Sequence, residues 1–484
     1  MEFEAVIGLE IHTQLKTKTK MFCSCKIVDS NSPSNSSICP VCTGQPGALP
    51  LPNEKAIEMA IKIGHSIKAK INNFSVFARK NYFYPDLPKG YQISQYDMPI
   101  CEDGYIEISN KKIRIKRAHI EEDAGKSLHA IGSQKLDYTL IDFNRCGVPL
   151  VEIVSEPDIS TPDEAYEYLV ELKRLLKWID VSNCDMEKGE LRCDVNVSIR
   201  EKGAKEFGTK VEIKNLNSFK AVKDALTYEI ERQTRMRQAN EKIEQDTRLW
   251  DANKLMTLSM RTKEMANDYR YFPDPDLLPI NIEQGKIDKI KLEIPKLPYE
   301  IKKEYISKYS LKANDIESVT SSKYLNSYFT KILSLTNDAD VIKNSLNIIN
   351  THLLSYINQN KIDEEDIELK SPSPHYIFEI ALMLSKGEIS SAVSKKLFEE
   401  IIKKPQSPLE LIEKLGLKQT NDIFEIEKFV KEAIEFNKKA FEDFKKGQEK
   451  ATGPIVGYVM KKSKGKANPK IVMDILKKLT SSLQ

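Results

Sequence analysis

Apolar and polar residues alternate with a period of two over much of the first 290 residues, whereas apolar residues recur at helical spacing through the rest of the chain. The alternation predicts strands over residues 4–15, 150–154, 189–199 and 208–213. Helical spacing after capping residues predicts helices over residues 53–69, 162–178 and 219–239. The pattern therefore predicts an α+β protein in which a β-rich part precedes all-helical parts.

Two proline-containing segments divide the chain. Pro295 and Pro298 fall where the strand-like alternation ends, and a second linker follows at residues 403–408. At ~100–200 residues per domain, a chain of this length holds roughly two to four domains. We therefore expect a β-rich domain at 1–292, a helical domain at 293–405 and a small helical tail domain at 406–484.

Acidic residues interrupt the apolar strands. Glu152 lies within the apolar run 150–154, on a strand face that would normally be apolar. Burial of an unpaired carboxylate is unfavourable, so Glu152 either lies in water on an edge strand or is paired with a cation. Glu10 and His12 share one face of the first strand, which is either a solvated outer face or a metal or proton-donor site. Further acids are Glu121, Glu122, Asp123, Asp142, Glu156, Asp158, Asp194 and Glu212. If these oxygen ligands converge, they favour a site for Mg²⁺ or for phosphate.

The cysteines fall into two groups. Four of the eight form two close pairs joined by a polar loop over residues 23–42, namely Cys23, Cys25, Cys39 and Cys42. This spacing is typical of a closed structural zinc site, and the alternative is two unrelated pairs of reduced thiols. The other four, which we expect to be small buried apolar residues, are Cys101, Cys146, Cys184 and Cys193.

Two segments combine cations with residues suited to nucleotide or nucleic-acid contact. Residues 79–95 interleave aromatic and basic side chains in a proline-pinned loop that either stacks a base or sugar and grips phosphate, or forms a packed aromatic turn. Near the C-terminus, the basic patch consists of Lys461, Lys462, Lys464 and Lys466. It is either a solvated face or a contact with a phosphate backbone.

Composition narrows the class of protein. The net charge is only +3, from 74 Lys and Arg against 71 Asp and Glu, so any contact with RNA depends on a local patch. No apolar run is long enough for a transmembrane helix, and the N-terminus lacks a signal-peptide or transit-peptide pattern, which together indicate a cytoplasmic protein. P-loop, dinucleotide-binding, HExxH and GxSxG motifs are absent from the sequence. These features predict a Mg²⁺-assisted enzyme with a locally basic helical tail.

Long motifs in the same order carry a specific resemblance. They are VIGLEIH, CPVCTGQPGALP, KNYFYPDLPKGYQISQ, HIEEDAGKS, DFNRCGVPLVEIVSEPD, LRCDVNVS, EIKNLNSF and DYRYFPDPDL, followed in the tail by ATGPIVGYVMKKSKGKANP. The chain resembles the B subunit family of the glutamyl/aspartyl-tRNA-dependent amidotransferases over almost its whole length. Two positions depart from the family pattern, Lys296 in the hinge and Tyr458 in the tail. Neither lies in the expected site.

The resemblance implies a cradle-like catalytic domain and a reaction shared with partner subunits. It implies that ATP and Mg²⁺ phosphorylate the side-chain carboxylate of glutamate or aspartate misacylated on tRNA(Gln) or tRNA(Asn). It implies that ammonia, released from glutamine by an amidase subunit, then displaces phosphate, and that a small third subunit completes a heterotrimer. Two alternatives stay open on the residues alone: a stand-alone ATP-dependent ligase acting on a free amino acid, and a non-catalytic tRNA-binding scaffold.

The resemblance also implies roles for individual residues. Around the metal and the aminoacyl end it implies Glu10, His12, Glu122 and Glu152, with Glu121, Asp194 and Glu212 as second choices. For neutralising phosphate it implies Lys214 and Arg145, and for lining the same cradle Tyr82, Tyr84 and Lys89. The four-cysteine zinc site belongs to one branch of the family, so the reaction does not require it.

Overall fold

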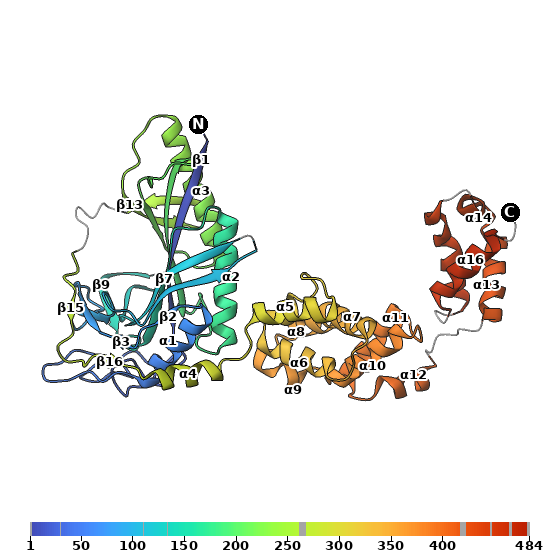
Figure 1. Ribbon diagram of the computed structural model, residues 1–484, viewed down its shortest axis with the longest axis horizontal. Coiled ribbons are helices and arrows are strands. Elements are labelled where there is room, and N and C mark those ends of the chain that lie inside the picture. The colour runs from blue at the N-terminus through green and yellow to red at the C-terminus, as the bar shows by residue number, and fades with distance from the viewer. Residues whose placement is uncertain are drawn as a thin grey trace. The chain divides into compact units, whose positions relative to one another are not determined.

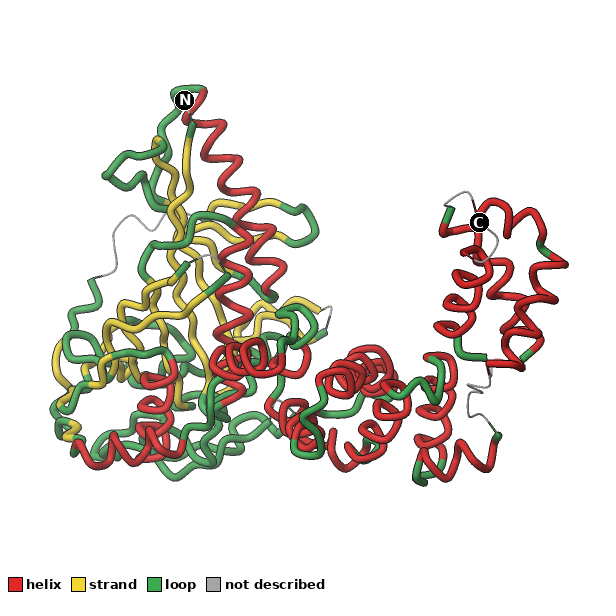
Figure 2. The backbone as a smooth tube through the Cα atoms, turned by 45° about the vertical axis from the view of Figure 1, so that its right-hand side comes forward, coloured by secondary structure: helices red, strands yellow, loops and turns green. Residues whose placement is uncertain are grey.

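The computed structural model describes residues 2–29, 31–109, 111–132, 134–260, 268–416, 423–445, 448–463 and 467–481. Contacts divide the chain into two compact units, Met1–Leu297 and Pro298–Gln484. The first contains a large sheet with helices, and the second is helical in its described residues (Figures 1 and 2). The predicted α+β class is confirmed, whereas the division into three domains stays a prediction.

A nine-stranded sheet organises the first unit. Its strands, in spatial order, are β14 (Met256–Ser259), β13 (Asp246–Asp251), β12 (Val211–Lys214), β11 (Leu191–Glu201), β1 (Phe3–Gln14), β10 (Pro149–Ser155), β7 (Lys112–Glu122), β6 (Cys101–Glu107) and β2 (Lys70–Ile71). Neighbouring strands are antiparallel except β12 and β13, which are parallel. β10 has a partner strand on each side, so the expectation that Glu152 could lie on an edge strand is wrong.

The described residues also form three smaller sheets. They are formed by β15 (Phe272–Pro273), β4 (Ala78–Asn81) and β5 (Tyr91–Ser94), by β16 (Ile280–Asn281) and β3 (Phe74–Ser75), and by the hairpin of β8 (Lys126–Ile131) and β9 (Gln134–Asp142). The predicted aromatic and basic loop therefore lies largely in and between β4 and β5. The short strands hold it beside the large sheet, because β5 contacts β7.

The helices of the first unit form where capping residues begin amphipathic stretches. They are α1 (Glu54–Ser66), α2 (Pro162–Trp178), α3 (Phe219–Gln238) and α4 (Gln284–Glu293). Asn53, Thr161 and Ser218 each accept a hydrogen bond from the first turn of the helix that follows. Helices α2 and α3 contact each other and lie along one side of the sheet (Figure 1). The predicted helices agree with α1, α2 and α3 to within a few residues.

The two faces of the large sheet differ in chemistry because strand residues point alternately to opposite faces. Along β1, the core-facing residues Ile7, Leu9 and Ile11 are at most 1% exposed. Val195 and Val197 of β11 continue this buried layer. Burial of this apolar face against the helices fixes which residues face the other side, and those residues are mostly polar.

The second unit consists of α5 (Pro298–Tyr309), η1 (Ser318–Thr320), α6 (Lys323–Leu333), α7 (Ala339–Ile348), η2 (Ile349–Leu353), α8 (Leu354–Gln359), η3 (Glu364–Asp366), α9 (Ile367–Lys370), α10 (Pro374–Ser385), α11 (Ser391–Lys403), α12 (Pro408–Leu415), α13 (Ile423–Phe436), α14 (Lys438–Lys445), η4 (Glu449–Thr452), α15 (Gly453–Lys462) and α16 (Pro469–Ser481). Helices α13 to α16 enclose an apolar core of their own, which includes Ile426, Val430, Ile455 and Leu476. Among the described helices, none is both long and apolar enough to span a membrane.

Candidate functional site

Polar side chains form rows across the face of the large sheet that faces away from the helices. In one row, His119 of β7 lies opposite Glu152 of β10, which lies opposite His12 of β1, which lies opposite Arg192 of β11. Directly opposed residues of antiparallel strands project from the same face, so all four side chains are neighbours. The acids and histidines that are far apart in the sequence therefore meet on one surface.

His12 lies at the centre of this surface, between two carboxylates. Its Nε2 is 3.3 Å from Oε1 of Glu121 and 3.4 Å from Oε2 of Glu152. The same Oε2 atom is 3.2 Å from Nε2 of His119. The ligand atoms of His12, Glu121 and Glu152 all lie within 4.8 Å of one another, which is an arrangement that could hold a metal ion. These three residues are called the metal group below.

The local charges alter the protonation of this group. Burial lowers the pKa of His12, but the carboxylates of Glu152 and Glu121 outweigh it and raise the pKa to about 9. Burial likewise opposes ionisation of Glu152, yet His119 and His12 hold its pKa well below the usual range. Glu152 is therefore an anion that lies close to both imidazoles.

The donor set fits a divalent cation. One imidazole and two carboxylates are suitable ligands, and His119 orients one of the carboxylates in the way that outer partners orient metal ligands. Nearby side-chain atoms on this part of the sheet have hydrogen-bonding capacity that is not used within the described residues, namely Nε of Arg117, Nδ1 of His119 and Oδ1 of Asn196. Buried polar atoms without partners are expected where a ligand or water completes the contacts.

Glu122 does not join this group. It follows Glu121 directly in β7 and so points to the opposite face of the strand, where it is paired with Lys89 and accepts a hydrogen bond from the backbone nitrogen of Ile93 at 3.0 Å. Glu122, which was expected around the metal, is thus paired with Lys89, which was expected to line the cradle, and the roles of both residues stay predictions. The group contains Glu121, predicted as a second choice, in the place expected for Glu122.

A second charged group lies one strand further along the same face. Nζ of Lys214 is 2.6 Å from Oδ2 of Asp194 and 2.9 Å from Oε1 of Glu212. Burial lowers the pKa of Lys214, but these carboxylates raise it above its usual value. Glu10 lies between the two groups, opposite Asp194, and accepts a hydrogen bond from Nδ2 of Asn196 at 2.8 Å. The structure thus brings four further predicted residues to the same face without placing Glu10 in the metal group.

Two arginines contact Asp123 and have different environments. Arg145 donates to the backbone oxygens of Ala124 and Gly125, at 3.1 and 2.6 Å, so its guanidinium supports a turn. Arg192, which the sequence analysis did not single out, is the cross-strand neighbour of His12. Its position in LRCDVNVS, two residues before Asp194, was the available signal, because both side chains must then share a face. His119 was missed in the same way, although it lies two residues before Glu121.

The aromatic residues of the loop form a chain of ring contacts. Tyr82 contacts Tyr84 and Tyr269, with ring centroids 6.0 Å apart in each case, and its hydroxyl donates to Gln92 at 3.0 Å. Nζ of Lys80 lies 4.9 Å from the ring centroid of Tyr269. Burial opposes the charged form of Lys80, yet the carboxylates of Glu121 and Glu152 contribute to a raised pKa of this side chain. The loop is therefore both packed and close to the acids of the sheet.

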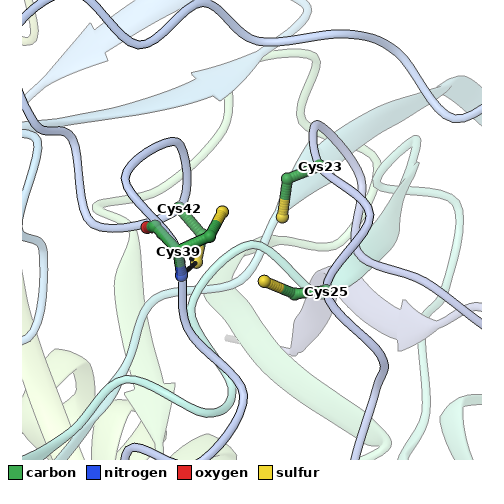
Figure 3. Close-up of side chains that lie close together, drawn as sticks. All are labelled: Cys23, Cys25, Cys39 and Cys42. Carbon is green, nitrogen blue, oxygen red and sulfur yellow. Dashed lines mark hydrogen bonds between the residues drawn. The ribbon is translucent and has the colours of Figure 1, made fainter.

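The four predicted zinc ligands come together from two loop segments. The sulfur atoms of Cys23, Cys25, Cys39 and Cys42 point toward one another (Figure 3) and lie within 4.8 Å of each other. The alternative of two unrelated pairs is therefore excluded. A hydrogen bond with Cys23 lowers the pKa of Cys42 to about 4. The buried ammonium of Lys20, 3.6 Å from Sγ of Cys42, favours the same thiolate.

The remaining predicted residues have simpler environments. The four other cysteines, Cys101, Cys146, Cys184 and Cys193, are buried as expected. In the tail, Lys461 is exposed at the end of α15, and Lys462 lies 3.3 Å from Glu432. Lys464 and Lys466 lie outside the described residues.

The fold and the site define a protein in which a sheet with an acid-rich polar face belongs to the first unit and the second unit is helical. Residues 5–288 match the model described as GatB/GatE catalytic domain, and residues 327–479 match the model described as GatB domain. The chain is similar to the B subunit of the aspartyl/glutamyl-tRNA(Asn/Gln) amidotransferase of Persephonella marina, with 48% identity covering 99% of this chain and 100% of the relative. Proteins of the same name from Elusimicrobium minutum and Thermotoga maritima are 48% and 45% identical, each over 99% of both chains. The chain belongs to this family of tRNA-dependent amidotransferase B subunits.

Proposed function

We propose that this protein activates the side-chain carboxylate of glutamate or aspartate misacylated on tRNA(Gln) or tRNA(Asn), so that the carboxylate can be converted to an amide. The names of its relatives support the substrate class. The observation that carries the proposal is the meeting of His12, Glu121 and Glu152 on the polar face of the sheet, with the imidazole 3.3–3.4 Å from the two carboxylates. The overall reaction is the formation of a C–N bond driven by ATP, which makes the enzyme a ligase of protein biosynthesis.

The reaction consists of two displacement steps. An oxygen of the side-chain carboxylate attacks the γ-phosphorus of ATP, the bond to the bridging oxygen breaks, and ADP leaves. The nitrogen of ammonia then attacks the carbonyl carbon of the acyl phosphate, inorganic phosphate leaves, and one proton is lost. Phosphorylation is needed because the oxygen of a carboxylate is a poor leaving group, whereas phosphate is a good one.

Different residues on the sheet would position the metal ion and balance the charge of the phosphates. His12, Glu121 and Glu152 would hold Mg²⁺, with His119 orienting Glu152. When bound, Mg²⁺ offsets negative charge on the phosphates during transfer. Lys214 contributes a cation at the same face, held by Asp194 and Glu212. Preorganised charges of this kind act mainly by positioning and electrostatic stabilisation.

Other parts of the chain serve the complex. Ammonia would come from glutamine through a partner amidase subunit, since the sequence lacks an evident glutaminase constellation, and a small third subunit would complete the cytoplasmic heterotrimer. Tyr82 and Tyr84, with Lys80, would line the nucleotide side of the site, since aromatic rings beside a cation suit bases and phosphates. Zinc at the four cysteines would order the loop at 23–42 without taking part in the reaction.

The catalytic assignment is tested with Glu152→Gln in the assembled complex. Amide formation on misacylated tRNA should be abolished, while glutamine hydrolysis by the partner subunit continues. Asp158→Asn is a matched control, because Asp158 is held by Arg114 in a more exposed pair and should leave amide formation unchanged. Unchanged amide formation in Glu152→Gln would remove Glu152 from the catalytic set, and absence of ATP turnover by the complete wild-type system would favour the scaffold alternative.

The tail is proposed to contact tRNA. Helices α13 to α16 have their own apolar core, and deletion of residues 410–484 removes this core together with most of α12, which contacts α10 and α11. The truncated protein should bind tRNA more weakly while its affinity for divalent metal stays the same. Equal tRNA affinity in filter-binding or fluorescence assays would refute this assignment.

A further inference from the structure

Arg192 lies beside the metal group, and a contact with Asp123 holds the end of its side chain. It lies opposite His12 in the register of β1 and β11, and its side chain is 42% exposed. Its Nη2 is 2.7 Å from Oδ1 of Asp123, whose side chain is 3% exposed. A long cationic side chain that is still open to solvent is thus tied at one end to a buried anion.

Asp123 is a rigid anchor for this guanidinium. Its backbone nitrogen donates to the oxygen of Val148 at 2.8 Å. Its second carboxylate oxygen lies 3.3 Å from Nε2 of Gln14 and 3.5 Å from Nε of Arg145. Because Asp123 is fixed on several sides, it holds one end of the Arg192 guanidinium in place.

Most of the hydrogen-bonding capacity of Arg192 is unused within the described residues. A guanidinium has five N–H donors in a planar fork, and one nitrogen is engaged by Asp123. An open edge of such a fork matches the two oxygens of a carboxylate, which accept parallel hydrogen bonds. The neighbouring Arg145 differs, since two of its nitrogens donate to backbone oxygens.

The charges around Arg192 favour a singly charged ligand. The carboxylate of Asp123, and more weakly those of Glu121 and Asp194, raise the pKa of Arg192 although burial opposes this. The three acids offset the positive potential of the guanidinium. These acids would repel a polyphosphate more strongly than a single carboxylate, which adds one charge and gains a geometric match.

We propose that the guanidinium of Arg192 binds the side-chain carboxylate of the amino acid esterified to tRNA. The inference rests on the proposed function and names how that site recognises its substrate. The carboxylate would accept hydrogen bonds from the open edge of the guanidinium beside His12. The amide product carries no charge and offers one oxygen in place of two, so Arg192 distinguishes substrate from product.

The test compares equilibrium binding of Glu-tRNA(Gln) and Gln-tRNA(Gln) to the complete complex without ATP. Wild type should prefer the glutamyl form, and Arg192→Met should lose about tenfold of that preference, the effect of removing one charge-assisted interaction. Arg192→Lys should retain part of it, because charge remains without the fork. In turnover, Arg192→Met should raise KM for the misacylated tRNA and leave KM for ATP unchanged. Arg114→Met, which removes a guanidinium paired with Asp158, is the control and should keep the wild-type preference.

The outcomes separate this inference from the proposed function. If wild type binds both tRNA forms equally, the carboxylate is not recognised and the proposed function itself loses support. If wild type prefers the glutamyl form and Arg192→Met keeps the full preference, the subsite is wrong while the function stands. A rise in KM for ATP alone would assign Arg192 to phosphate and also overturn the inference.

Discussion

Glu121 and Glu122 are adjacent in β7 and chemically identical, and the structure assigns them to opposite faces. Glu121 lies 3.3 Å from His12 in the metal group, whereas Glu122 is paired with Lys89. Replacing each by glutamine therefore perturbs two different parts of the protein with the same change in atoms. We expect Glu121→Gln to weaken metal binding and Glu122→Gln to weaken the fold.

The expected losses of metal affinity and of unfolding free energy follow from the environments of the two glutamate side chains. Outer partners of metal ligands are worth about 10–100-fold in metal affinity, so loss of a direct ligand in Glu121→Gln should cost at least about 100-fold, or roughly 2.7 kcal/mol. The Lys89 and Glu122 side chains are 7% and 2% exposed. Removing one partner of such a buried pair leaves an uncompensated charge and costs about 3–5 kcal/mol of unfolding free energy.

Two measurements on each variant distinguish a loss of metal binding from a loss of stability. Mn²⁺, which accepts the same oxygen and nitrogen ligands as Mg²⁺ in this setting, reports metal affinity by titration calorimetry, and urea unfolding followed by circular dichroism reports stability. Glu122→Gln should be less stable while folded molecules keep wild-type Mn²⁺ affinity. If Glu122→Gln loses Mn²⁺ affinity and Glu121→Gln keeps it, the metal group derived from the sheet register is wrong.

Four further outcomes are expected. Cys39→Ser should lose bound zinc and lower the thermal unfolding midpoint, and zinc analysis showing unchanged stoichiometry would contradict a four-cysteine site. Glu229 has a fully buried carboxylate, 2.6 Å from Arg232, so Glu229→Gln should cost about 3–5 kcal/mol in urea unfolding. Asp158→Asn, in a more exposed pair, should cost less than about 1 kcal/mol of unfolding free energy. Equal losses in Glu229→Gln and Asp158→Asn would mean that burial does not determine how much each ion pair contributes to stability. Lys461→Gln should reduce the salt dependence of tRNA binding by about one phosphate contact, and an unchanged slope would remove Lys461 from the interface.

Local pattern was sufficient for much of the fold. The capped helices at α1, α2 and α3 and the long strand β1 were predictable, because spacing and capping residues act within a few positions of one another. The approach of the four cysteines was predictable for a different reason, since two close pairs joined by one polar loop have a recognised chemistry. The family was predicted from the long ordered motifs, because the periodicity of apolar residues indicates secondary structure and not a family.

The choice between Glu121 and Glu122 required the tertiary structure. Alternation shows that the two point to opposite faces, but it does not show which face is polar. The pairing of β7 with β10 shifts register between Val154 and Ser155, and a shift of one residue reverses the faces of everything beyond it. Ile115, before the shift, is therefore buried in the apolar core, although it has the same sequence parity as the site residue Glu121.

Long-range pairing also decided the interior position of Glu152 and the role of Arg192. Whether a strand lies at an edge depends on partners far away in the chain, and β10 is flanked by β1 and β7. Arg192 became a candidate only when β11 was placed beside β1, because its charge alone does not distinguish it from many surface arginines.

The central place of β1 bears on how the protein is made. Residues 3–14 leave the ribosome well before their partner strands, which are Pro149–Ser155 and Leu191–Glu201. During synthesis one backbone edge of β1 therefore stays open until residue 155 has been translated, and the other until residue 201, while Ile7, Leu9 and Ile11 are not yet buried. The strand that carries His12 is thus synthesised before both of its neighbours, and the rows of side chains that make up the site form only after the last of these strands has been translated.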